Sequence, residues 1–418
     1  MVINLIDWFS CNLFKNKLFL SLVLFFIYEP PYFATFKTLH DIYMILDFAI
    51  FGMLVVILFL LVVKGFRLDR TFFWICGFFG YIAFVTLIFH ADHVVMFVRD
   101  NISTISMCLI FFIWLKKCPN TLIDCFIVFD VYILLNLFTI LTHPDGLYST
   151  TLYKANWLFG YKNQMIRLIL PIISIAIIRS YKNHGRLNLY TIILIAISAV
   201  SLIMSQSATS LVGLTLFLLV LFIFHKKDRK LPKAINLFTI LAVVVFLYVF
   251  IVIARNMSAF SFLIVGVLGR DLTFTSRTVI WDMALKNFSQ RPLFGYGYMV
   301  ASDYVKMFNG IEYYAHPHNY FLYCAMTGGI GLLAILVAGV FFANRSLKKN
   351  INSANGMYGK IILFSITALM FMGLVESLTG TILHYPMFVL AMEADKIAGI
   401  PYGKSRIRFT LKNNSFNP

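Results

Sequence analysis

Long apolar runs dominate the pattern of hydrophobic and polar positions along the chain. A run of about 18 or more apolar residues with few charges is long enough to cross a bilayer as a helix. The pattern predicts about twelve such helices, separated by short polar connections. They lie near residues 18–35, 42–63, 71–90, 95–115, 121–142, 163–180, 188–205, 207–224, 235–253, 319–343, 358–378 and 381–398.

The composition supports a membrane protein rather than a soluble one. Of the 418 residues, 60% are hydrophobic and 13% are charged, against roughly 45–50% apolar and 25% charged in globular proteins. We therefore expect one all-α, polytopic integral membrane domain over residues 1–418. The first apolar run continues into Tyr28–Pro31 without a small-residue cleavage site, so we expect a retained helix and not a signal peptide.

The positions of the basic residues predict the orientation in the membrane. Most of the 35 lysines and arginines fall in alternate connections, such as 64–70, 226–233 and 396–412. Translocation of basic residues is disfavoured, so these connections and both termini should be cytoplasmic. The net charge of +17 then reflects topology and contact with anionic membrane lipids. No basic stripe lies on a recognisable reading element, so nucleic acid is not an expected partner.

One long connection, residues 254–318, joins the ninth and tenth predicted spans on the outer side. Connections of this length are uncommon unless they are functional or disordered. The stretch 275–290 has the pattern of an amphipathic helix, with Ser276 as a plausible N-cap and Asp282 four residues before Lys286. The turn that follows contains Gly295 and Gly297, which permit close backbone approach.

Four arginines lie in this outer loop, where basic residues should be scarce. Planar guanidinium groups bind phosphate oxygens in pairs, so the cluster suits a diphosphate ligand. The simpler alternatives are that Arg277 contacts lipid phosphate and that Trp281, one turn later, anchors at the membrane interface. The arginines are Arg255, Arg270, Arg277 and Arg291.

Two histidines and an asparagine, His316, His318 and Asn319, directly precede the tenth span. Pro317 is tolerated at a helix start, so we expect the helix to begin there with His318 and Asn319 at its outer end. The unsatisfied amides and the dipole of a helix N-terminus favour an anion. A histidine there could donate to phosphate or accept a hydroxyl proton. The alternative is that both histidines only cap the helix.

Other kinds of active site have weaker support. The segments "HPH" (316–318) and "HADH" (90–93) each offer nearby imidazoles, but neither supplies three or four metal ligands at a familiar spacing. We therefore predict no metal site. The six cysteines are scattered through apolar runs and are expected to be packing residues.

Five short stretches together resemble the O-antigen polymerase and ligase superfamily, and exopolysaccharide polymerases of the succinoglycan type most of all. The resemblance is specific in the C-terminal half, while the N-terminal half is similar only in being helical and apolar. The stretches are "YKNQMIR" (161–167), "SQSATSLVG" (205–213), "GRDLTFTSRTVIW" (269–281), "RPLFGYGY" (291–298) and "HPHNYFL" (316–322) followed by "TGGIG".

The resemblance implies a bacterial inner-membrane glycosyltransferase with a GT-C-like fold. It implies an undecaprenyl-diphosphate-linked oligosaccharide as donor, an active site at the periplasmic face, no cofactor, and a chain-length regulator and a flippase as partners. His318 and Arg277 match the catalytic histidine and the diphosphate-binding arginine. Further diphosphate contacts are expected from Arg270, Arg167 and Lys162, and supporting roles from Asn319, Trp281, His316 and Asn163.

Three functions remain open at this point. A polymerase transfers the glycan onto a lipid-linked repeat unit, with His318 as base and Asp282 or Asp303 as alternative bases. A ligase uses the same donor and transfers the glycan to lipid A-core. Ligases carry an arginine near the position of Ala208, which favours the polymerase. The third function is a flippase or transporter, for which the deep ionisable candidates are Asp47 and Asp130.

Overall fold

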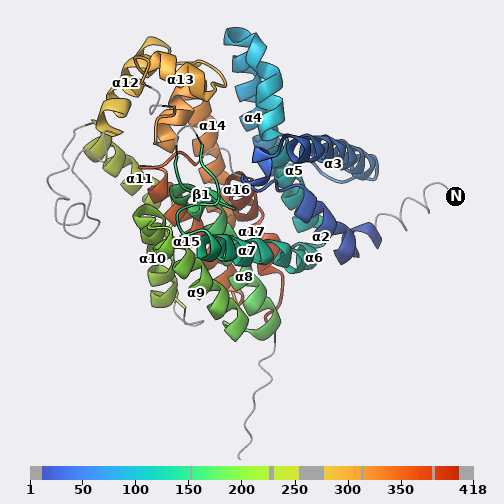
Figure 1. The fold of residues 1–418 in the computed structure, drawn as a ribbon. Helices are drawn as coiled ribbons and strands as arrows, with labels where there is room; N and C mark the ends of the chain where they lie inside the picture. The colour runs from blue at the N-terminus through green and yellow to red at the C-terminus, as the bar shows by residue number, and fades with distance from the viewer. Residues whose placement is uncertain are drawn as a thin grey trace, which may run out of the picture.

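The computed structural model describes residues 12–150, 153–225, 230–253, 277–311, 315–378 and 382–403 (Figure 1). Its regular structure is helical apart from one small sheet, which confirms the all-α prediction. The α-helices are α2 (Lys17–Phe26), α3 (Lys37–Val63), α4 (Arg70–Phe89), α5 (Val94–Lys117), α6 (Pro119–Cys125), α7 (Ile127–Thr142), α8 (Ile166–His184), α9 (Leu189–Met204), α10 (Ala208–Ile223), α11 (Leu237–Tyr248), α12 (Arg277–Gln290), α13 (Ala301–Met307), α14 (Tyr320–Asn350), α15 (Gly356–Met372), α16 (His384–Met392) and α17 (Ala394–Ala398).

Short irregular elements link several of these helices. Strands β1 (Asn156–Trp157) and β2 (Gly160–Tyr161) pair antiparallel, with Trp157 opposite Gly160. The 3₁₀ helices are η1 (Phe33–Thr35), η2 (Ala91–His93) and η3 (Lys162–Gln164), and a π-helical turn, η4 (Val249–Ile253), extends α11.

Each of the twelve predicted spans contains a helix. Within the described residues, six helical segments are long and apolar enough to cross a membrane: Lys37–Val63, Arg70–Phe89, Ala91–Lys117, Pro119–Thr142, Lys162–His184 and Tyr320–Asn350. The other apolar helices, such as α9 and α10, have 10–17 residues. The structure therefore supports a polytopic membrane protein, and the count of about twelve spans stays a prediction.

Two predicted spans end earlier than expected. The first leaves the helical conformation after Phe26, because Pro30 and Pro31 follow and cannot continue a helix. The eleventh, expected to reach residue 378, ends at Met372 with Gly373 as its C-cap. Residues 374–378 consequently form a non-helical segment beside the start of α14.

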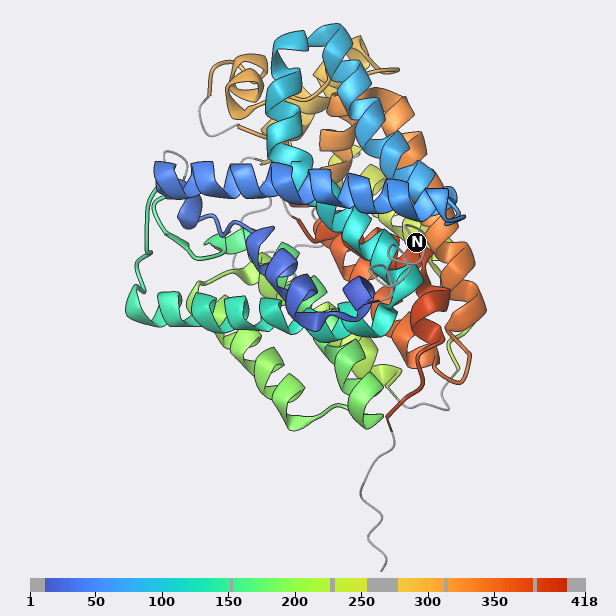
Figure 2. The same ribbon diagram turned by 90° about the vertical axis from the view of Figure 1, so that its right-hand side faces the viewer.

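The helices differ sharply in how deeply they are buried. The apolar part of Lys162–His184 is 89% buried, whereas that of Lys37–Val63 is 28% buried. Helix α8 thus lies inside the bundle, and α3 runs along its outside (Figure 2). The apolar side chains that α3 exposes, including Ile45, Val56 and Phe59, suit contact with lipid chains.

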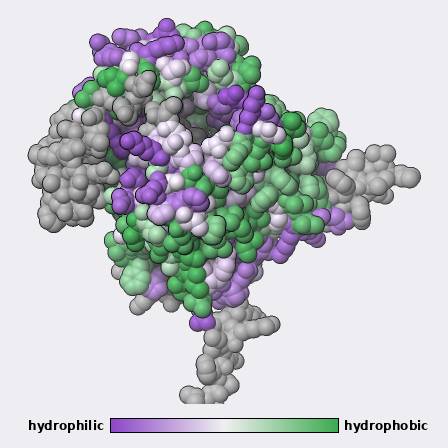
Figure 3. Space-filling model, in the orientation of Figure 1, coloured by the Kyte–Doolittle hydropathy of each residue, from purple (hydrophilic) through white to green (hydrophobic). Residues whose placement is uncertain are grey.

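A second, smaller core lies under α12 and α13. Trp281 is fully buried there, with Tyr296, Tyr304 and Met326 around it. Trp281 is therefore not an interfacial anchor but packs α12 against α14, and its supporting role at the site stays a prediction. Hydrophilic residues gather over the outer surface of α12 and α13, and hydrophobic residues cover α3 and the α9–α10 side (Figure 3).

The turn after α12 docks by its backbone onto a break in α14. Gly329 is non-helical (φ 60°, ψ −156°), which frees backbone groups on both sides of it. The Tyr296 N–H donates to the Met326 carbonyl at 2.8 Å, and the Ile330 N–H donates to the Pro292 carbonyl at 2.8 Å. A Cβ atom on Gly295 would collide with the Met326 carbonyl oxygen. The structure thus shows the close approach that the glycines predict.

Candidate active site

A buried carboxylate, Glu376, stands at the centre of the candidate site. The Arg277 Nη2 donates to Glu376 Oε1 at 2.8 Å, and Nη1 donates to the Val375 carbonyl. The Asn163 amide nitrogen donates to the same Oε1 at 3.1 Å. The His318 Nδ1 lies 4.0 Å from the other oxygen, Oε2. One carboxylate, 6% exposed, therefore joins residues that lie more than 200 positions apart in the chain.

All four residues lie where helices begin or end. Arg277 is the first residue of α12, Asn163 lies in η3 just before α8, His318 precedes α14, and Glu376 follows α15. The arrangement thus gathers side chains at one end of several helices.

The segment that carries Glu376 is fixed through its backbone carbonyl groups. The Gly373 carbonyl accepts from the Tyr320 N–H at 2.8 Å, and the Leu374 carbonyl accepts from the Asn319 amide at 2.8 Å. The Ser377 carbonyl accepts from Arg167 Nη1 at 3.0 Å. Asn319 also caps α14, accepting the Leu322 N–H at 2.9 Å. Asn319 therefore holds the start of α14 and the Glu376 segment together.

The helix α14 begins one residue after the predicted span 319–343 does, and three residues after Pro317. Asn319 is the N-cap and Tyr320 the first helical residue, so Pro317 lies outside the helix and His318 directly before the cap. His318 has a φ of +49°, a left-handed conformation that non-glycine residues rarely adopt. Its N–H donates to His316 Nδ1 at 3.2 Å. Strain of this kind clusters at functional sites.

The charges of the site are set by burial and by Arg277. Burial lowers the pKa of His318, and the positive charge of Arg277 lowers it further, while Glu376 opposes both. Burial alone would raise the pKa of Glu376, but Arg277 and His318 outweigh it and lower that pKa. Burial and His318 also lower the pKa of His316. The site thus holds a neutral imidazole beside an ionised carboxylate, a pair suited to accept and stabilise a proton.

The "SQSATS" segment (205–210) forms hydrogen bonds to two residues next to this cluster. The Ser207 hydroxyl donates to Asn163 Oδ1 at 3.2 Å, so it orients the amide whose nitrogen reaches Glu376. The Ser210 hydroxyl donates to the Lys162 carbonyl at 3.2 Å. These bonds tie the start of α10 to η3, and they place the Lys162 backbone next to the site.

Two candidates from the sequence lie apart from this cluster, and a third is not described. Arg270 is outside the described residues. Asp282 is exposed on α12, and Asp303 caps the Val300 N–H at 2.9 Å and lies 3.4 Å from His93. Within the described residues, neither aspartate is found in contact with His318 or Glu376, and their role as alternative bases stays a prediction. A separate group of possible metal ligands, with ligand atoms within 4.8 Å of one another, is His90, Asp92 and His93.

Sequence reasoning missed Glu376 altogether. The hydropathy pattern predicts a membrane span over residues 358–378, so Glu376 falls at the end of that span and is not recognised as a site residue. A signal was present, because a cluster of outer arginines calls for a counter-ion and Glu376 is a lone acid after a long apolar run.

Two comparisons with known proteins bear on this site. Residues 193–337 match the sequence model of the O-antigen ligase family. The chain is also 30% identical over 223 residues to "Exopolysaccharide production protein ExoQ" of Rhizobium meliloti (strain 1021). That alignment covers 48% of this chain and 48% of the curated relative, so the chain matches about half of that protein's length.

These matches support the resemblance of the chain to the O-antigen ligase and polymerase superfamily. The part that matches this superfamily runs from α9 into α14 and includes Arg277 and His318. The residues that complete the cluster, Asn163, Arg167 and Glu376, lie outside residues 193–337. The structure therefore joins the matched segment to two flanking segments in one site.

Proposed function

We propose that the protein is a polysaccharide polymerase of the bacterial inner membrane. In this proposal it transfers an undecaprenyl-diphosphate-linked glycan onto a lipid-linked repeat unit at the periplasmic face, and both termini are cytoplasmic. The observation that carries the proposal is the cluster of Arg277, His318 and Asn163 around Glu376.

The comparisons support a polysaccharide polymerase or ligase role. The printed name of the relative, an exopolysaccharide production protein, favours a surface or secreted polysaccharide as the product. Ala208 opens α10 at the position where the resemblance expects a ligase arginine, which favours polymerisation over ligation.

The proposed reaction is a single inverting displacement. An acceptor hydroxyl oxygen forms a bond to the anomeric carbon of the donor glycan while the bond from that carbon to the diphosphate oxygen breaks. The hydroxyl proton passes to His318, and undecaprenyl diphosphate leaves with the bonding electron pair. Diphosphate is a good leaving group, so the protein mainly aligns the substrates and stabilises developing charge.

Each residue of the cluster has a distinct task in this reaction. Arg277 faces the diphosphate, with Arg167 beside it, because a guanidinium offers several donors to phosphate oxygens. His318 is neutral and accepts the proton. Glu376 is a positioning residue: it holds Arg277 and stabilises the imidazolium that His318 becomes. The 4.0 Å between His318 and Glu376 is longer than a hydrogen bond, as is common before substrate binds.

The ligase is the second candidate, and the O-antigen ligase match over residues 193–337 favours it. A transporter has less support, because the cluster lies where helices begin and end. The deep acid Asp130 is paired with Arg179 rather than free to move a proton.

The experiment that separates the first two candidates is the glycan profile of cells with and without the protein. Loss of a polymerase leaves single repeat units on the lipid carrier, whereas loss of a ligase leaves long polymer stranded there. Purified protein that elongates a lipid-linked repeat in detergent, without any gradient, excludes the transporter. A requirement for an ion gradient would contradict the enzyme.

A further inference from the structure

Three side chains that can bind a metal, those of His90, Asp92 and His93, lie together in the turn between α4 and α5. His90 is the C-cap of α4, and His93 ends the 3₁₀ helix η2 directly before α5. A 3₁₀ helix has three residues per turn, so side chains three positions apart project on the same side. The rings of His90 and His93 accordingly stack, with centroids 5.2 Å apart.

The segment that follows α12 fixes which nitrogen of His93 carries a proton. His93 Nδ1 lies 3.2 Å from the Tyr298 carbonyl oxygen and 3.4 Å from Asp303 Oδ2. A carbonyl oxygen can only accept a hydrogen bond, so Nδ1 is the donor. Histidines that bind a metal through one nitrogen usually donate from the other to a carbonyl or carboxylate. His93 has the second half of that arrangement.

The other ring nitrogen of His93 faces a carboxylate. Nε2 lies 3.4 Å from Asp92 Oδ2. In a neutral ring whose proton is on Nδ1, Nε2 has a lone pair and no hydrogen. This lone pair and the carboxylate oxygen repel each other unless a positive charge lies between them. A metal ion supplies that charge, and so does a second proton on the ring.

The distances and the kinds of ligand favour a metal ion. Ligand atoms about 2.0–2.2 Å from a tetrahedral zinc ion are about 3.4 Å apart, which matches the separation of Nε2 and Asp92 Oδ2. The three residues each offer one ligand atom, and these atoms lie within 4.8 Å of one another. A rotation of the half-buried His90 side chain brings its nitrogen closer. Two imidazoles and one carboxylate suit zinc, whereas magnesium and calcium take mainly oxygen ligands.

We propose that His90, Asp92 and His93 bind one zinc ion, with Asp303 as a positioning residue behind His93 and water in the fourth position. The proposal does not rest on the proposed function. The spacing of the three ligands predicted no metal site, because it shows neither the tight turn nor the distant Asp303 that orients His93.

The zinc ion would stabilise the contact between this turn and the segment after α12. The Tyr298 N–H donates to Thr86 Oγ1 of α4 at 2.8 Å, and the Tyr298 carbonyl accepts from His93. The end of α4 and the turn thus hold both backbone groups of Tyr298. A metal that binds only the folded arrangement stabilises it.

The test uses the purified full-length protein without a histidine tag, and zinc chloride as the probe. The protein is freed of metal with a chelator and titrated with zinc, and its zinc content is measured after gel filtration. The wild type should retain about one zinc ion per chain. Zinc should also raise its thermal unfolding midpoint by about 2 °C or more.

Variants of the ligands should lose zinc while the protein stays folded. Asp92→Asn and His90→Ala should each weaken zinc binding by at least about tenfold, because each removes one of three ligands. Asp92 is 77% exposed, so its replacement leaves the core intact. Asp303→Asn should weaken binding by about tenfold, the effect of losing the partner behind a metal-binding histidine.

The matched controls are His143→Ala and Asp145→Asn, which change an exposed histidine and aspartate with the same spacing as His90 and Asp92. Both should bind zinc as the wild type does.

Three results would overturn the zinc site. One is a wild type that retains no zinc, which would assign a second proton to the His93 ring. Another is an equal loss of zinc in the control variants, and the third is magnesium binding as tight as zinc binding.

Discussion

Two arginine–carboxylate pairs with a buried carboxylate occur among the described residues, and they are built differently. Arg179 of α8 pairs with Asp130 of α7, and the Tyr190 hydroxyl of α9 donates to the same carboxylate at 2.8 Å. All three residues lie within regular helices. Arg277 and Glu376 instead lie at a helix start and in a non-helical segment, with a histidine 4.0 Å away. The first pair fastens helices together, whereas the second lies among helix ends and next to a histidine.

The difference shows that burial of an ion pair does not by itself mark a functional site. What distinguishes the Glu376 pair is its neighbour His318, held in a left-handed conformation (φ +49°). Variants at the Arg277–Glu376 site should therefore lose activity, whereas variants of the Arg179–Asp130 pair should lose stability.

The largest expected effect is that of replacing His318. His318→Asn should lower the rate of glycan elongation by roughly 10²–10⁴-fold, the usual contribution of a general base. Asparagine tolerates the left-handed conformation, so the loss would report the imidazole and not the backbone. Elongation by purified protein measures the rate, and His143→Ala, at an exposed histidine, serves as the control. Elongation at the wild-type rate would remove His318 from the mechanism.

The next largest effect is the loss of stability expected from a variant of the Arg179–Asp130 pair. Asp130→Asn should lower the free energy of unfolding by about 3–5 kcal/mol, because it leaves Arg179 buried without a counter-charge. The rate per folded molecule should stay near that of the wild type. Thermal unfolding followed by size exclusion, together with the elongation assay, measures both quantities. A stable but inactive Asp130→Asn protein would contradict the structural role of this pair.

A smaller effect is expected for Arg277→Lys. Lysine keeps the charge but loses the planar set of donors, so binding of undecaprenyl diphosphate should weaken by about tenfold, or ~1.4 kcal/mol. Titration of the purified protein with undecaprenyl diphosphate measures the affinity. Arg179→Lys is the matched control, and an equal loss of affinity there would show that the effect is not specific to the site.

The smallest effect concerns pH. His318 must be neutral to accept a proton, so activity should fall as the pH is lowered through its pKa. Burial and Arg277 lower that pKa, so the inflection should lie below the ordinary value of about 6.5. Glu376 raises the pKa of His318, so Glu376→Gln should move the inflection to lower pH. An inflection that moves to higher pH would contradict the contact between the two residues.

The sequence predicted the helical framework and part of the site. Arg277 and His318 were predicted from the outer-loop arginines and the histidines before the tenth span as well as from the resemblance, and Asn163 from the resemblance alone. The structure brings the three together around one carboxylate. The close approach of Gly295 to α14 was predicted from the conformational freedom of glycine, and the structure shows it.

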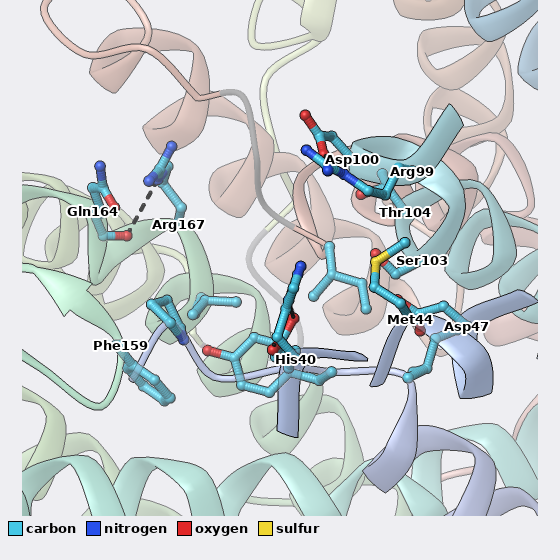
Figure 4. Close-up of a pocket in the computed structure, with 16 residues that line it drawn as sticks. His40, Met44, Asp47, Arg99, Asp100, Ser103, Thr104, Phe159, Gln164 and Arg167 are labelled. Atoms are coloured by element: carbon cyan, nitrogen blue, oxygen red, sulfur yellow. Dashed lines mark hydrogen bonds and ion pairs between the residues drawn. The ribbon is translucent and has the colours of Figure 1, made fainter. Parts of the chain in front are cut away.

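Other features could not be predicted, for physical reasons. Glu376 was hidden because hydropathy alone does not show where an apolar run stops being helical, and Gly373 ends α15 early. A cavity of about 270 Å³ joins single residues of α3, α5 and α8, such as Asp47, Arg99 and Arg167 (Figure 4), and their spacing in the sequence carries no periodic signal. The burial of Trp281 could not be predicted because an aromatic residue on an amphipathic helix can face either the membrane interface or a local core.

The most direct test of the central claim is elongation of a purified lipid-linked repeat unit in detergent, without a gradient, by three proteins side by side. We predict elongation by the wild type, a rate lower by roughly 10²-fold or more for His318→Asn, and a near-wild-type rate per folded molecule for Asp130→Asn. Elongation by His318→Asn at the wild-type rate, or none by the folded wild type, would contradict the claim that the Glu376 cluster is a glycosyl-transfer site.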